Sequence, residues 1–173
     1  MREASEVGAR TQLVRVLQDA HAGELAAAYA YRGHWKSLWR ARRVAERAEV
    51  RRIEGAEWHH RSLVAAMLTD LGERPRRPRE LLMAGIGRFF GLLCFVGGHF
   101  GPMYAAGRLE ASNVRQYEAA ERNAAALGRT ADVACLREMV DEEYRHEVFF
   151  GDQVRGHVLL PLTRRLLGWG PPP

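Results

Sequence analysis

A spaced pattern of glutamates and histidines occurs twice in this chain of 173 residues. In each copy a single glutamate precedes a Glu-x-x-His pair by 33 residues, and the second copy follows the first by 86 residues at all three positions. Residues three apart on a helix share a face, so each pair can direct a carboxylate and an imidazole at one point. The six residues are Glu24, Glu57 and His60 in the first copy and Glu110, Glu143 and His146 in the second.

This ligand set constrains both the fold and the chemistry. Four helices that together supply four glutamates and two histidines are typical of carboxylate-bridged dinuclear metal proteins. We therefore expect an all-α, ferritin-like four-helix bundle with a dinuclear metal site in its core. Carboxylates combined with imidazoles suit iron, or manganese as the alternative, better than magnesium or calcium. One Glu-x-x-His pair among 21 acidic residues can arise by chance, but two equally spaced copies are much harder to explain in that way.

The repeat extends to two tyrosines. Tyr31 and Tyr117 follow Glu24 and Glu110 by seven residues, again with the offset of 86. Seven residues make about two helical turns, so each tyrosine lies on roughly the ligand face. We take both as candidate catalytic residues beside the metals, with ordinary core packing as the alternative.

The composition favours helices throughout. Hydrophobic residues make up 47% of the chain, and Ala, Leu, Arg and Glu are abundant. We divide the chain into an N-terminal extension (1–10), the bundle (11–158) and a C-terminal amphipathic tail (159–173). The predicted helices run from Thr11 to about Trp39, from Val44 to Leu71, from Glu80 to Leu127 with a kink between Gly97 and Pro102, and from Thr130 to Val158, with a loop over 72–79.

The segment 89–107 has 19 residues without a formal charge, which raises the question of a membrane span. We reject the span, because Arg88, His99, Pro102 and several glycines weaken its hydropathy. Glu110, the single glutamate of the second copy, also follows this segment by about one helical turn, at the position where the bundle requires a metal-binding residue. We expect one face of this helix to pack in the bundle and the other to face lipid or an apolar substrate.

Charge and cysteine content indicate which partners and which cellular compartment to expect. The net charge is +5 and Lys36 is the only lysine, but no basic tract is interleaved with aromatic residues, so we expect no nucleic-acid partner. Cys94 and Cys135 are predicted to be two buried thiols in a reducing cytoplasm. The segment 1–10 lacks an apolar core, so it does not have the pattern of a secretory or transit peptide.

Several other titratable residues are predicted to lie outside the site. Glu54 and Glu142 are expected on other helix faces, and His59 is expected to be exposed. His34 and His157 are predicted to be surface or capping residues. His21 and His99 each lie near one of the single glutamates in sequence, and the alternative to a role at the site is that one or both only hydrogen-bond to backbone.

Four sequence blocks resemble one enzyme family over roughly residues 13 to 157. The chain is similar to the demethoxyubiquinone hydroxylases at the helix positions that carry the ligands. The blocks are His21-Ala-Gly-Glu24 with Tyr31-Arg-Gly33, Glu57-x-x-His60, Gly98-x-x-Gly101-x-Met103 leading to Glu110 and Tyr117, and Glu142-Glu-Tyr-Arg-His146 followed by Asp152.

The resemblance implies a monooxygenase that hydroxylates the ring of a polyprenylated quinone precursor in ubiquinone biosynthesis. It implies two irons, O2 and electrons from NADH or another donor, on the inner face of the cell membrane. A second copy of the chain or a lipid-presenting protein is its expected protein partner. It also implies that Glu24, Glu57, His60 and Glu143 surround one iron, and that Glu57, Glu110, Glu143 and His146 surround the other.

Three features depart from the family and leave the substrate open. The interval from Glu24 to Glu57 is longer than expected, 35–52 is rich in arginine, and the Pro-Pro-Pro end is unfamiliar. The alternatives are a related di-iron oxidase acting on another apolar molecule, a ferritin-like protein that oxidises or stores iron, and a non-catalytic helical module.

Overall fold

The computed structural model describes residues 2–39 and 43–172, and within these ranges all regular secondary structure is helical. This confirms the all-α class. The helices are α1 (Arg2–Ser37), α2 (Val44–Asp70), α3 (Arg77–Leu93), α4 (Phe100–Ala126), α5 (Thr130–Val154) and α6 (Leu160–Leu167).

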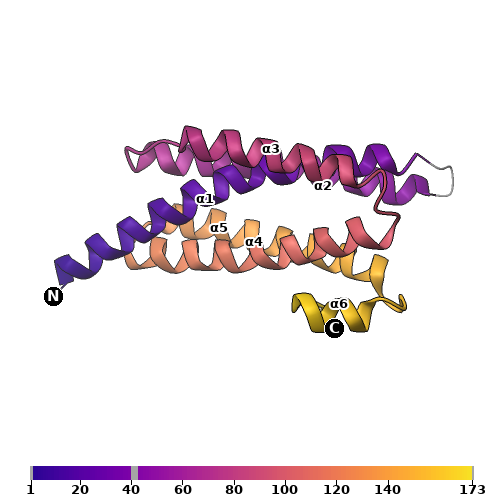
Figure 1. Cartoon of the computed structure of the whole chain (residues 1–173). Coiled ribbons are helices and arrows are strands. Elements are labelled where there is room, and N and C mark those ends of the chain that lie inside the picture. The colour runs from indigo at the N-terminus through magenta and orange to yellow at the C-terminus, as the bar shows by residue number, and fades with distance from the viewer. Residues whose placement is uncertain (1, 40–42, 173) are drawn as a thin grey trace.

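Helices α1 to α5 form an elongated stack in which consecutive helices run in opposite directions (Figure 1). Helix α1 contacts α2, α3 and α4, while α4 packs along α5 and α2 also meets α5. The short α6 lies below α4, at the opposite end of the stack from the start of α1. The four helices that carry the repeated glutamates and histidines are α1, α2, α4 and α5.

Two clusters of buried apolar side chains hold these four helices together. One contains Tyr31, Ile53 and Phe150. The other contains Leu17 and Tyr117, together with aliphatic residues of α2 and α5. On α1, α2 and α5 the repeated Glu and His residues fall between the positions that enter the two clusters, and on α4 Glu110 lies near the end of the stretch that enters the first cluster. Each fully buried large side chain contributes about 1.5–3 kcal/mol, so these clusters stabilise a polar layer between them.

The prediction of one kinked helix from Glu80 to Leu127 is wrong. The chain instead forms two helices, α3 and α4, which run in opposite directions (Figure 1). Between them Gly98 adopts a φ of +66°, which glycine tolerates far better than other residues. Pro102 lies in the first turn of α4, where a missing backbone N–H costs little. The reversal makes α3 an additional helix outside the four that carry the repeated glutamates and histidines.

Helix α3 packs against α1 with almost no side chain between the two backbones. A Cβ atom at Gly33 would clash with the backbone of Gly91, and one at Gly87 would clash with the backbone of Ala26. Glycine therefore permits a backbone approach that any larger residue would prevent.

The two ends of the chain also differ from the expected boundaries. Helix α1 extends through most of the segment predicted as an N-terminal extension, and α5 ends at Val154 instead of Val158. The tail folds back on α4 and α5, because Tyr104 Oη donates to the Trp169 carbonyl at 2.8 Å and Trp169 Nε1 donates to Glu147 Oε1 at 2.8 Å. A Cβ atom at Gly107 would clash with the Trp169 ring, so that glycine leaves room for the indole.

Candidate metal centre

The six repeated side chains meet in the polar layer between the two apolar clusters. None of them is more than 2% exposed. Helices α1 and α4 each contribute one glutamate, and α2 and α5 each contribute a Glu-x-x-His pair. The helical spacing within each pair directs its carboxylate and its imidazole to the same side, as the sequence pattern requires.

The side chains form two overlapping groups. In each group one ligand atom per residue lies within 4.8 Å of the others, as two ions with shared bridging carboxylates require. Glu57 and Glu143 belong to both groups, so each can bridge two metal positions. The first group is Glu24, Glu57, His60 and Glu143, and the second is Glu57, Glu110, Glu143 and His146.

The hydrogen bonding of these residues fits metal ions. Five buried ligand atoms have no hydrogen-bond partner among the described residues: Glu24 Oε2, both carboxylate oxygens of Glu57, and both ring nitrogens of His146. Leaving a buried polar atom unsatisfied costs about 1–3 kcal/mol, and more for a charged group. Two divalent cations would give these oxygens and at least one imidazole nitrogen a partner, and the mixed oxygen and nitrogen donors suit iron or manganese.

The carboxylates also perturb one another. Burial, followed by the negative charge of Glu143, raises the pKa of Glu57 and of Glu110 well above the usual range. Burial raises the pKa of Glu24 as well. The pKa of Glu143 is lowered, because the neighbouring imidazoles outweigh the effect of its burial: His60 hydrogen-bonds to it, and His146 Nδ1 lies 3.8 Å away. If all four carboxylates were ionised in this low-dielectric layer, they would carry more negative charge than the two histidines could balance, and bound cations would stabilise the ionised forms.

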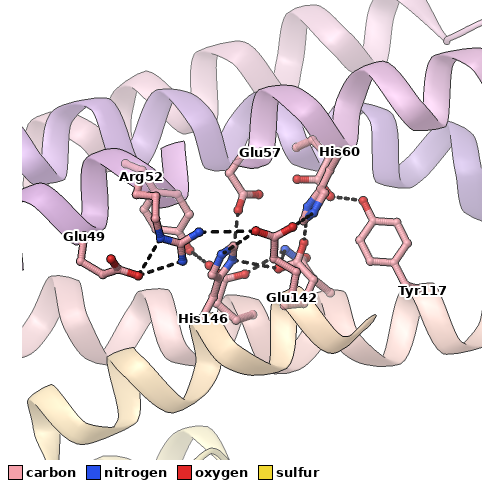
Figure 2. Close-up of polar contacts among 12 residues, drawn as sticks. Glu49, Arg52, Glu57, His60, Tyr117, Glu142 and His146 are labelled. Carbon is pink, nitrogen blue, oxygen red and sulfur yellow. Dashed lines mark hydrogen bonds and ion pairs between the residues drawn. The ribbon is translucent and has the colours of Figure 1, made fainter. Parts of the chain in front are cut away.

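Glu142 lies against the histidines, which corrects its predicted place on an unrelated helix face. His60 Nδ1 lies 2.9 Å from Glu143 Oε1, while His60 Nε2 lies 3.2 Å from Glu142 Oε2 (Figure 2). The other Glu142 oxygen lies 3.9 Å from His146 Nε2. Burial lowers the pKa of His60, but the hydrogen bond to Glu143 and the surrounding carboxylates outweigh it and raise the pKa to about 9.

Arg52 connects Glu142 to the protein surface. Its guanidinium lies 3.4 Å from Glu142 and 2.8 Å from Glu49 (Figure 2). Both Arg52 and Glu142 are partly exposed, so these ion pairs orient side chains and contribute little stability by themselves. The Glu142 carboxylate is thereby held between solvent and the buried histidines.

Both candidate tyrosines contact the site, and each hydrogen-bonds to the glutamate of the other repeat. The Tyr31 hydroxyl donates to Glu110, and the Tyr117 hydroxyl donates to Glu24. Burial and the neighbouring carboxylates raise the pKa of both phenols well above the usual value, so both stay protonated. The crossed pairing therefore links α1 to α4 on both sides of the site.

Asn113 is a site residue that the sequence pattern did not indicate. Its side-chain amide donates to Glu110 at 3.2 Å and to Glu143 at 3.5 Å. Its counterpart in the repeat is Ala27, so only one half of the site has this amide. Asn113 follows Glu110 by three residues, about one helical turn, and this spacing could have indicated that it lies near the site.

The remaining histidines lie outside both groups. His34 was predicted at the surface, but it is 2% exposed and stacks on Phe150, so that prediction is wrong. His21 pairs with Glu80 at 2.7 Å. His59 and His157 are exposed. His99 Nε2 lies 3.3 Å from a carboxylate oxygen at the start of α2.

Glu54 lies outside both groups, as the sequence predicted. It is buried and accepts hydrogen bonds from Arg32 and Trp35, so it stabilises the α1–α2 contact. One further prediction needs correction. Cys94 and Cys135 are free, but each is only partly buried.

An apolar cavity of about 950 Å³ lies beside the site, enclosed by α1, α3, α4 and the tail. Small residues such as Ala27, Ala30 and Gly87 line it, together with Phe90. Tyr31 also lines the cavity. Among the described residues that line the cavity, Tyr31 is the one that hydrogen-bonds to one of the six repeated glutamates and histidines.

Comparisons of the chain with protein-family models, with curated proteins and with solved structures found no match. None of the described helices is long and apolar enough to cross a membrane.

Proposed function

We propose that this chain is a ferritin-like four-helix bundle with two iron ions, manganese being the alternative, and that it is an O2-dependent monooxygenase. The observation that carries the proposal is the convergence of four buried glutamates and two buried histidines into two overlapping groups. In their reduced state, two bound iron ions would supply electrons to O2. The site residues by themselves support an oxygen-using dinuclear protein. The resemblance of the sequence to demethoxyubiquinone hydroxylases extends it to ring hydroxylation.

Glu57 and Glu143 are the proposed bridging ligands, because each belongs to both groups. Glu24 and His60 complete one position, and Glu110 and His146 complete the other. Tyr31 and Tyr117 hold the two non-bridging carboxylates by hydrogen bonds. The apolar clusters on both sides exclude water from these groups, which strengthens every charge interaction inside the layer.

The apolar cavity supports an apolar organic substrate. A volume of about 950 Å³ is large enough for an aromatic ring with part of a hydrocarbon chain. Its contact with Tyr31 brings it next to the Glu110 side of the site. An iron-storage protein does not need such a cavity, so this feature favours the enzyme. We infer a quinone-like substrate, with electrons supplied by NADH or another donor.

The exposed face of α3 supports a peripheral position on the inner face of the cell membrane. Leu82, Phe89 and Leu92 on α3 are each more than half exposed, as are Val96, which follows the helix, and Leu166 on α6. Large exposed apolar side chains that cluster on one element mark interaction surfaces. Such a surface would place the cavity close to the lipid that contains a polyprenylated quinone.

The test is isotope incorporation by iron-loaded protein. A short-chain methoxybenzoquinone is supplied with a chemical reductant and ¹⁸O2, and the product is analysed by mass spectrometry. We expect a hydroxylated ring that contains one labelled oxygen atom, and no such product with Glu143→Ala. Absence of a hydroxylated product with NADH and with every chemical reductant tried would contradict the proposal.

A further inference from the structure

The two halves of the site have the same ligands but different surroundings. In the first half, the Tyr117 ring lies among buried aliphatic residues that include Leu17, Val64 and Leu136. In the second half, the Tyr31 ring borders the apolar cavity. Tyr117 is not among the described residues that line this cavity. One half of the site is therefore enclosed by packed core, and the other is next to empty apolar space.

The internal repeat shows where this difference comes from. Ala27 and Ala30 line the cavity, and their counterparts 86 residues later are Asn113 and Gln116. Asn113 uses its position to bind Glu110 and Glu143. On α1 the same positions carry only methyl groups, which leave space between α1, α3 and α4. The ligands are thus repeated along the chain, whereas the residues beside them have diverged.

His34 adds a polar feature to the same cavity. It follows Tyr31 by three residues and so lies on the same side of α1. It lines the cavity, and its buried Nε2 has no hydrogen-bond partner among the described residues. A neutral imidazole there can exchange a hydrogen bond with a carbonyl or hydroxyl oxygen of a ligand, which a purely aliphatic wall cannot do.

From these observations we propose that the cavity binds an uncharged apolar ring compound and presents it to the Glu110–His146 half of the site. Tyr31 is the contact residue between the ligand and that half, whereas Tyr117 only positions Glu24. The inference rests on the proposed function for the identity of the reaction. Beyond that function, it specifies the half of the site that the substrate approaches and the one of the two repeated tyrosines that the substrate contacts.

The test uses metal-free protein and the neutral fluorophore N-phenyl-1-naphthylamine, so it requires no iron, O2 or reductant. Ala30→Phe fills the cavity and should weaken binding of the fluorophore at least ten-fold. Ala125→Phe places the same ring at an exposed position on α4 and should leave the dissociation constant within two-fold. Equal binding by the two variants would overturn the assignment of the cavity.

The matched pair Tyr31→Leu and Tyr117→Leu tests the difference between the halves. Tyr31→Leu joins the cavity to the polar layer, so the bound fluorophore should emit at longer wavelength and its dissociation constant should change at least five-fold. Tyr117→Leu should leave both quantities unchanged. Equal effects of the two substitutions, or an effect of Tyr117→Leu alone, would overturn the proposal. Protein without hydroxylase activity can still pass this test, so failure of the proposed function is distinguishable from failure of this inference.

Discussion

Glu142 shows how one partly exposed carboxylate can orient a buried ligand. Its contact with His60 Nε2 leaves Nδ1 directed at Glu143 and the proposed metal position. Outer carboxylates of this kind hold the ring and increase the basicity of the ligand nitrogen. The counterpart of Glu142 in the first repeat is Ala56, so a single carboxylate serves this purpose in the described site.

We expect Glu142→Gln to lower the affinity for Mn²⁺ about 10- to 100-fold while leaving the helix content unchanged. The neutral amide keeps the shape of the side chain but not its charge. Competitive titration against a chelating dye measures the affinity. Glu138→Gln, at an exposed position on the same helix, is the control and should bind Mn²⁺ as the wild type does. Wild-type affinity in Glu142→Gln would refute the orienting role.

His34 should make stability depend on pH. Burial, and then the positive charge of His99, lower its pKa to about 4, against 6.5 for an unperturbed histidine. Below pH 6.5 the unfolded chain therefore binds a proton that the folded chain excludes. The stability is fully present above pH 6.5 and is lost as the pH falls toward 4. By pH 5 the loss from this residue should be about 2 kcal/mol.

Urea unfolding of wild type and His34→Gln at pH 7 and pH 5 checks this contribution. The variant should lose less stability between the two pH values, because glutamine has no proton to gain. Comparing the two proteins cancels the titration of the carboxylates, which is common to both. An identical pH dependence in both would show that His34 is not kept neutral by the fold.

The approach of the six repeated residues to one another was predictable from sequence, but several of their neighbours were not. Helical spacing is local, so the positions of Glu57 and His60 already imply a shared face. The contact of Glu142 with His60 depends on how far a side chain extends from one helix to another. The spacing of residues along the sequence does not reveal this distance. The burial of His34 likewise depends on Phe150, more than a hundred residues away in the chain.

At the scale of the helices, predictions succeeded where glycine and proline mark the end of a helix. Helix α2 matches its predicted range within one residue, since the Gly-Pro-rich loop follows it directly. The α3–α4 reversal was missed, because a run of apolar residues shows the same helical period whether the chain bends or turns back. The positive φ at Gly98 is a property of the folded chain. The apolar cavity was unpredictable for the same reason, because α3 helps to enclose it.

The close contact of α1 and α3 makes Gly33 sensitive to a single methyl group. We expect Gly33→Ala to destabilise the protein by about 1–3 kcal/mol, because the Gly91 backbone must move. Gly55→Ala on α2 meets nothing within 4 Å and should instead stabilise by about 0.5–1 kcal/mol. Denaturant unfolding compares the two. A stabilising Gly33→Ala would contradict the backbone contact.

At the scale of the whole molecule, metal binding and protonation should be coupled. The raised pKa values of Glu57 and Glu110 mean that these carboxyls keep protons in the folded, metal-free protein at pH values where the unfolded chain has lost them. Their stabilising contribution is present at low pH and is lost as the pH rises through the folded pKa. A metal ion requires the deprotonated form, so it replaces protons.

We therefore expect Mn²⁺ to raise the midpoint of thermal unfolding more at pH 8 than at pH 6. Calorimetry at the two pH values with saturating and with no Mn²⁺ measures the difference. Glu143→Ala is the control, because it removes a carboxylate common to both groups and should show little metal-dependent shift. A larger shift at pH 6 than at pH 8 would contradict proton displacement.

The most direct test of the dinuclear site is the number of iron ions bound per chain after anaerobic loading with Fe²⁺ and removal of the excess. We expect two per chain in the wild type. Glu143→Ala should retain its helices but lose dinuclear binding, because it lacks one carboxylate common to both metal positions. No bound iron or manganese would contradict a metal site, and many ions per chain would favour iron storage over catalysis. Two ions retained by Glu143→Ala would refute its bridging role.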